Sequence, residues 1–122
     1  MFQISNSQVT DGYYLFSPVI SFPEENQLYE TILMDTSGTI INEWVHDKGT
    51  ASTPYLLSDS TLLRPCKIPP PMFDAGGAGG LIQLISWTND ILWEYQIFNI
   101  QESQHHDIEP LPNGNILAIS WD

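Results

Sequence analysis

The chain is organised around the stretch His105-His106-Asp107-Ile108-Glu109-Pro110-Leu111-Pro112-Asn113-Gly114-Asn115-Ile116-Leu117. The pair Asn113-Gly114 lies between apolar runs and predicts a β-hairpin, because both residues tolerate the positive φ that tight hairpin turns need. One arm of this hairpin opens with His105, His106 and Asp107. A hairpin does not require two histidines at the start of a strand, so this pair is the first candidate for chemistry.

Strands and turns, rather than helices, are expected along the rest of the chain. No window of helical length has clean 3.6-residue spacing of apolar side chains. Tight turns between antiparallel strands are expected at Asp35–Gly38, Ser58–Ser60, Thr88–Asp90 and Pro112–Gly114. We therefore predict an all-β fold without any helix longer than about two turns.

Two pairs of segments resemble each other at nearly constant spacing. Residues 33–44 match residues 84–95 at a displacement of 51, and residues 57–63 match residues 111–117 at a displacement of 54. A unit recurring about every 40–50 residues is typical of propeller blades, although a plain up-and-down β meander also produces imperfect copies. The predicted architecture is a partial, incomplete β-propeller of about two to three four-stranded antiparallel blades. Its expected parts are a partial blade over residues 12–45, a full blade over 54–97 and the start of a next blade over 105–122.

Strand alternation also predicts which apolar side chains lie between packed sheets. The residues expected to be buried there are Leu33, Leu57, Leu63, Ile85, Leu92, Leu111, Ile116 and Leu117. One ring of the pair His105 and His106 is expected to face a pocket at the inner end of its strand.

Composition limits the classes of function. The 122 residues are 42% hydrophobic and 11% aromatic, as in a folded domain. Fifteen acids against three bases give a net charge of −12, which disfavours binding to nucleic acid or to anionic membranes. The acids either solvate a β surface or bind cations, but no regular Asp-x-Asp-x-Asp loop supports the second use.

Cys66 is the only cysteine, which excludes an internal disulfide and a cysteine-based zinc site. We expect it to be a structural thiol. The segment 1–6 lacks a basic region followed by an apolar core, so no signal peptide is predicted. No run reaches the roughly 18 apolar residues of a membrane span. Taken as written, the sequence predicts a cytoplasmic protein without a membrane segment.

The histidine pair has two interpretations. In a regular strand His105 and Asp107 share one face and His106 shares the other with Ile108. The structural interpretation makes His106 a core residue, His105 a surface residue and Asp107 an ordinary acid at the start of a strand. The functional interpretation uses imidazole as a proton shuttle, nucleophile or anion ligand, with Asp107 holding a ring in one tautomer. Since His46 is the only other histidine, no zinc site is expected.

Two further features of the sequence are candidate ligand sites. The run Gly76-Gly77-Ala78-Gly79-Gly80 does not read as a phosphate loop, because no Lys-Ser/Thr follows it and the next element is a predicted strand. Close backbone approach, or a sharp turn into that strand, explains it better. Arg64 is the only arginine and either clamps an oxyanion or is a solvated strand end.

Four segments together resemble the arylsulfotransferase (aryl-sulfate sulfotransferase) family. They are Asp11–Pro18 (DGYYLFSP), the glycine run with Leu81-Ile82-Gln83, Ile91–Tyr95 (ILWEY) and His105–Leu117. The resemblance runs in order from about residue 12 to residue 122. It implies a β-propeller that moves a sulfuryl group between phenols, needs no nucleotide or other cofactor, and uses a transiently sulfated histidine in its central channel.

The resemblance also implies roles for particular residues. His105, His106 and Asp107 would be the catalytic group in the channel, and Arg64 and Asn115 would contact the substrate. The sulfated histidine is expected on a later blade, so the pair here would hold sulfate or transfer a proton.

Family members are longer and usually exported, so this sequence is expected to be an N-terminal portion. Such a portion should be inactive alone and should self-associate, or pair with missing blades, through exposed strand edges. The alternative is a non-catalytic propeller-like module that binds a partner through strand edges or an acidic face.

Overall fold

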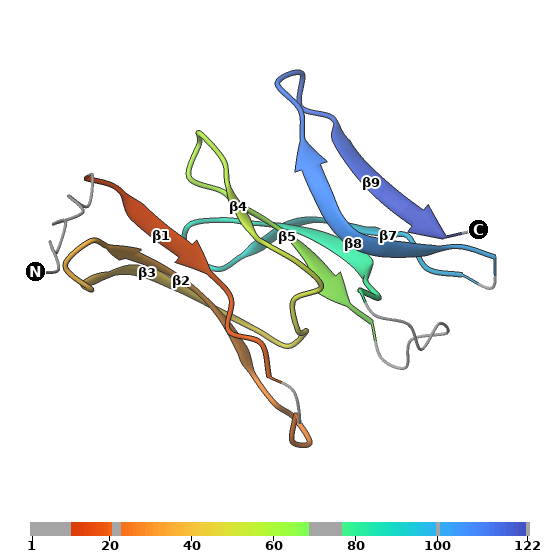
Figure 1. Cartoon of the computed structure of the whole chain (residues 1–122), viewed down its shortest axis with the longest axis horizontal. Coiled ribbons are helices and arrows are strands. Elements are labelled where there is room, and N and C mark those ends of the chain that lie inside the picture. The colour runs from red at the N-terminus through yellow and green to blue at the C-terminus, as the bar shows by residue number, and fades with distance from the viewer. Residues whose placement is uncertain (1–10, 21–22, 69–76, 100, 122) are drawn as a thin grey trace, which may run out of the picture.

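The computed structural model describes residues 11–20, 23–68, 77–99 and 101–121. This part of the chain contains nine strands and no helix, which confirms the all-β prediction. The strands form three open antiparallel sheets, each built from one continuous stretch of chain (Figure 1). Accordingly, none of the described residues belongs to a helix long and apolar enough to cross a membrane.

The first sheet has the order β1-β2-β3, with β1 (Tyr13–Phe16), β2 (Tyr29–Asp35) and β3 (Ile40–His46). The second has the order β4-β5-β6-β7, with β4 (Tyr55–Leu56), β5 (Leu62–Lys67), β6 (Gly80–Ile85) and β7 (Ile91–Gln96). The third pairs β8 (Ser103–Pro110) with β9 (Ile116–Trp121).

Four hairpins use one and the same turn. In each hairpin, the carbonyl of the residue before the turn accepts a hydrogen bond from the backbone N–H of the residue three positions later. That donor residue has a positive φ. The donors are Gly38 (φ 87), Ser60 (φ 66), Asn89 (φ 73) and Gly114 (φ 83), with N–O distances of 2.9 to 3.1 Å. This is the three-residue hairpin connection that places its last residue in the left-handed region. The four tight turns predicted from the sequence are therefore confirmed.

Strand pairing repeats at the same displacements as the turns. β2 and β3 shift register between Leu33 and Met34, and β6 and β7 shift between Leu84 and Ile85, which is 51 positions later. Likewise β4 pairs with β5 through Leu56 and Leu62, and β8 pairs with β9 through Pro110 and Ile116, which is 54 positions later. The two displacements therefore describe equivalent places in the sheets.

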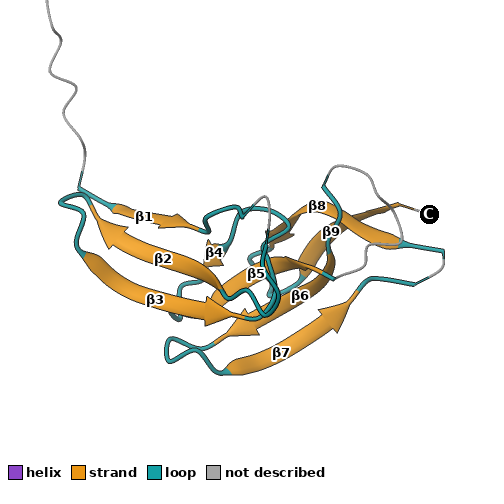
Figure 2. Ribbon diagram, turned by 90° about the horizontal axis from the view of Figure 1, so that it is seen from below, coloured by secondary structure: helices purple, strands orange, loops and turns teal. Residues whose placement is uncertain are grey.

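The core lies between stacked sheets (Figure 2). Leu33 and Trp44 of the first sheet pack on Leu62 and Ile85 of the second. Leu63 and Ile82, on the opposite face of the second sheet, pack on Ile108 of the third. β5 and β6 are thus covered on both faces, which explains why they are mostly buried.

The burial predictions are confirmed for side chains that lie between two packed sheets. Leu33, Leu63 and Ile85 are buried as predicted, and the half-buried residues are Leu57, Leu111 and Ile116. The predictions for Leu92 and Leu117 are wrong, since these side chains are 55% and 58% exposed. Both lie on outer strands, β7 and β9, that have a sheet partner on one side only.

Candidate functional site

The histidine pair lies in a bulge of β8, where regular alternation breaks down. Gln104 pairs with Ser120 and Ile108 pairs with Ala118, so residues 105–107 face a single residue of β9. His106 has φ 56, a left-handed conformation. His105 is half-buried and His106 is exposed, so the assignment of His106 to the core is wrong. The bulge, which the sequence pattern did not reveal, is the reason.

The two imidazoles lie next to each other and to an aromatic ring. The His105 ring centroid is 4.2 Å from that of His106, at an interplanar angle of 67°. It is 4.0 Å from the ring of Trp121 at the end of β9. The rings of His105 and His106 are therefore gathered at one end of the third sheet.

The glycine run packs directly against this bulge. His106 donates its backbone N–H to the Gly77 carbonyl at 2.7 Å, and Gly79 donates to the Gln104 carbonyl at 3.0 Å. A Cβ at Gly77 would overlap the His106 ring, and one at Gly79 would overlap the Gln104 amide. Close backbone approach is thus confirmed as the role of the described glycines, whereas Gly76 lies outside the described residues.

Asp107 is hydrogen-bonded to a tyrosine rather than to an imidazole. The Tyr55 hydroxyl donates to Asp107 Oδ2 at 3.1 Å, and the buried Asp107 Oδ1 has no hydrogen-bond partner. Burial, reinforced by the Asp107 carboxylate, raises the pKa of Tyr55. Tyr55 was missed from the sequence because it belongs to no motif. The repeat at a displacement of 54 relates β4 to β8, and this was the available signal that the strand carrying Tyr55 is equivalent to the strand carrying Asp107.

Arg64 and Asn115 lie away from the histidine pair. Arg64 is 1% exposed, so the prediction that it lies at a solvated strand end is wrong. The reason is that β5 continues through Pro65 to Lys67 instead of ending at Arg64. Arg64 alternates with Leu63, which packs toward the third sheet, so its side chain faces the first sheet. Asn115 is exposed in the hairpin turn at the far end of β8 and β9.

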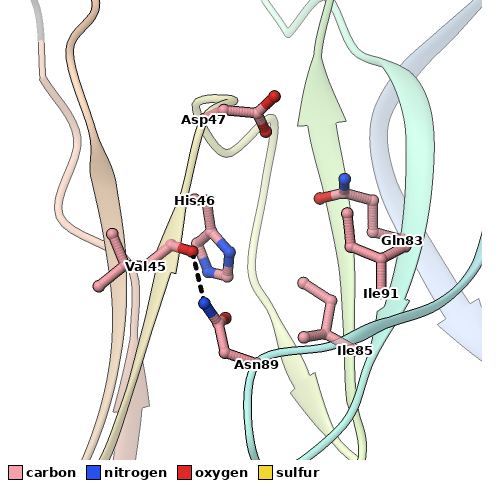
Figure 3. Close-up of a pocket in the computed structure, with 7 residues that line it drawn as sticks. All are labelled: Val45, His46, Asp47, Gln83, Ile85, Asn89 and Ile91. Atoms are coloured by element: carbon pink, nitrogen blue, oxygen red, sulfur yellow. Dashed lines mark hydrogen bonds between the residues drawn. The ribbon is translucent and has the colours of Figure 1, made fainter.

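A cavity of about 220 Å³ lies between the first and second sheets (Figure 3). Its lining residues are Val45, His46, Asp47, Gln83, Ile85, Asn89 and Ile91. His46 is 6% exposed, and its Nε2 lies 3.0 Å from the Thr31 hydroxyl. Burial, and then the nearby Arg64, lowers the pKa of His46 to about 3, so this imidazole is neutral at physiological pH. The alternation of Trp44 and His46 on β3 was the available signal for its burial.

A hydrogen-bonded chain leads from Arg64 to β7. Arg64 donates to Gln83 Oε1 at 2.8 Å and to the Lys48 carbonyl at 2.7 Å. Gln83 in turn donates to Glu94 Oε1 at 2.6 Å. Cys66 also contacts Gln83, at 3.2 Å, and burial raises the pKa of its thiol to about 11, as expected of a structural residue. Arg64 Nε is buried without a hydrogen-bond partner. Because the Arg64 side chain faces the first sheet, it does not reach the histidines of the third sheet.

Within the described ranges no three His, Cys, Asp or Glu side chains come together as a metal site. Comparison with protein-family models, curated proteins and solved structures finds no match to this chain.

Proposed function

We propose that this chain forms part of a β-propeller that transfers sulfuryl groups between phenols, with His105 and His106 holding the sulfate or transferring a proton. The observation that carries the proposal is the hydrogen bond between Tyr55 and Asp107. It joins the first strand of the second sheet to the first strand of the third, at the residue that follows His106 in the bulge.

The repeated geometry supports a propeller. Successive sheets pack on each other through buried side chains, each comes from a continuous stretch of chain, and their hairpins share one turn. In a propeller the blades surround a central channel, and the first strand of each four-stranded blade lies closest to it. β4 and β8 would then both border the channel, with Tyr55, Asp107 and the histidine bulge along its wall.

The side chains in this place suit the chemistry. Sulfuryl transfer leaves negative charge on the sulfate oxygens and on the departing phenolate, which hydrogen-bond donors in a fixed geometry stabilise. Imidazole groups supply donors and can protonate the phenolate, and Asp107 bound to Tyr55 fixes the end of the bulge. The proposal gives Arg64 no contact with substrate, since its side chain faces the first sheet, where it donates to Gln83 and to the Lys48 carbonyl.

The test is binding of 4-nitrophenyl sulfate, followed through the histidine ring signals in NMR. Release of 4-nitrophenolate is measured in parallel and is expected to stay at the uncatalysed rate, because the sulfated histidine is expected on a later blade. We expect the ester to shift the His105 and His106 rings but not the ring of His46. The variant His106→Ala should weaken this binding. Asn115→Ala is the matched control, since Asn115 lies about 17 Å along the strand from the pair and should leave binding unchanged. The site would be excluded if the ester shifted the ring signals of neither His105 nor His106, or if His106→Ala and Asn115→Ala weakened ester binding equally.

A non-catalytic interaction module is the second candidate, and β7 favours it. All six β7 residues are exposed, and the rings of Trp93 and Tyr95 stack with centroids 5.9 Å apart. An exposed aromatic strand at a sheet edge is a suitable surface for another polypeptide. A chain that ignores the sulfate ester while its β7 variants change association would favour this function.

A further inference from the structure

The contact between β3 and the second sheet is built from three side-chain hydrogen bonds to backbone. Trp44 donates to the Ser86 carbonyl, Asn42 donates to the Trp87 carbonyl, and Asn89 donates to the Val45 carbonyl, each at 2.9 Å. The turn between β6 and β7 thus lies over β3. Trp44 is completely buried as a result.

β7 is the counterpart of β3, but among the described residues no turn lies over it. At the displacement of 51, Asn42 corresponds to Trp93 and Trp44 corresponds to Tyr95. Trp93 is 41% exposed and Tyr95 is 56% exposed, whereas Trp44 is 0% exposed. The face that a following turn would cover is therefore open on β7.

β9 is likewise the counterpart of β5 with one neighbour fewer. At the displacement of 54, residues 62–67 of β5 correspond to residues 116–121 of β9. β5 lies between β4 and β6, whereas among the described strands β9 pairs only with β8. Leu117 and Ile119 on β9 are 58% and 60% exposed. The third sheet thus has counterparts of β4 and β5 but, within the described residues, none of β6 and β7.

We propose that a second copy of this chain supplies the two strands, with its β2–β3 hairpin docked along β9 of the first copy. β2 and β3 are the counterparts of β6 and β7 at the displacement of 51, and they share the turn and the register shift. The docked hairpin continues the interface that already exists between the first and second sheets.

The pairing of β5 with β6 fixes the register of this contact. Leu62 pairs with Ile85 and Lys67 pairs with Gly80. Transferring these pairs by the two displacements places Ile116 opposite Met34 of the second copy and Ser120 opposite its Glu30. The turn at residues 35–38 of the second copy then lies over Trp93 and Tyr95.

The docking requires β9 to replace β1 beside β2 of the second copy. β1 is only four residues long, and its Tyr13 and Tyr14 are 69% and 50% exposed. Leu15 of β1 pairs with Leu33. In the proposed register Leu117 of one copy replaces Leu15 opposite Leu33 of the second copy. The exposed Leu117 side chain then covers the core cluster that contains Leu33.

Exchange of β1 leaves each copy contributing the other eight of the nine described strands, which make two four-stranded sheets. Propellers close with about four to eight such sheets, so we expect rings of about two to four copies. A head-to-tail contact of this kind closes into a ring or grows without limit. The net charge of −12 opposes assembly, so salt should strengthen it.

The inference does not depend on sulfuryl transfer and is tested by disulfide trapping. Protein carrying Glu30→Cys is mixed with protein carrying Ser120→Cys and oxidised, and the linked peptides are identified by mass spectrometry. Both positions are exposed, and the native Cys66 is buried. We expect the mixture to form disulfide-linked pairs in several-fold higher yield than Ser58→Cys mixed with Ser120→Cys, because Ser58 is exposed in the turn between β4 and β5, which the docked hairpin does not contact.

Native mass spectrometry and light scattering provide the second measurement. The chain should form assemblies of two to four copies, and Tyr95→Lys should weaken them at least about tenfold, because it buries a charge at the contact. Ser58→Lys is the matched control and should leave the assembly unchanged. A monomer at every protein and salt concentration, or trapping no better than in the Ser58 mixture, would overturn the inference.

Discussion

Gly79→Ala tests whether the close packing of the glycine run holds the histidine bulge in place. A methyl group at position 79 would overlap the side-chain oxygen of Gln104. Gln104 is completely buried, accepts a bond from the Gly80 N–H at 3.1 Å and donates one to the His106 carbonyl at 2.9 Å. The amide therefore cannot move aside without losing both bonds.

The expected loss of stability follows from these two bonds. Each contributes about 1 kcal/mol, and leaving the buried Gly80 N–H without a partner adds about 1 kcal/mol or more. We expect Gly79→Ala to lower the free energy of unfolding by about 2–4 kcal/mol, measured by urea unfolding with tryptophan fluorescence. The melting temperature should fall by about 8–16 °C.

Two controls separate this packing effect from a general effect of alanine. Gly114 has φ 83 but no atom within 4 Å of an added Cβ, so Gly114→Ala should cost only about 1–2 kcal/mol from its backbone conformation. Gln104→Ala removes the overlap, so the double variant should be about as stable as Gln104→Ala alone. A loss below about 0.5 kcal/mol for Gly79→Ala, or full additivity with Gln104→Ala, would refute the reasoning.

Three further outcomes are expected from the buried polar groups. Because the pKa of His46 is lowered from 6.5 to about 3, the unfolded chain binds a proton first. Stability is therefore complete above about pH 6.5 and falls toward pH 3, by at most about 1.4 kcal/mol per pH unit, and His46→Gln should flatten this slope in urea titrations. With a thiol pKa near 11 and no exposed surface, Cys66 should react with a thiol reagent at neutral pH only after unfolding. Arg64→Lys should lower stability by about 1–3 kcal/mol in the same urea assay, because one ammonium group cannot reproduce the bonds to both Gln83 and Lys48.

Local features of the fold could be predicted from the sequence. Each hairpin turn is fixed by three or four neighbouring residues, and Gly38, Asn89 and Gly114 supply the positive φ that the turn requires. Ser60 adopts the same conformation without being glycine or asparagine, and its counterpart at the displacement of 54 is Gly114.

The site could be predicted only in part, because its geometry depends on contacts distant in sequence. The bulge at residues 105–107 is stabilised by Gly77 and Gly79, which alternation within β8 cannot reveal. Asp107 is bonded to Tyr55, which is 52 positions away. Arg64 was assigned to a strand end because Pro65 suggested a break, yet β5 tolerates this proline and continues.

The distribution of charge bears on both the proposed sulfate site and the proposed assembly interface. Of the three basic side chains, Arg64 is buried and Lys48 is paired with Asp47 at 2.7 Å. Lys67 is exposed and forms no ion pair with another described residue. The surface therefore repels both a sulfate ester and another copy of the chain at low ionic strength. At about 0.15 M salt the repulsion is screened beyond about 8 Å, whereas hydrogen bonds and apolar contacts within the interfaces persist. Added salt should thus strengthen ester binding and assembly together, the reverse of the behaviour of a basic site that attracts its ligand by charge.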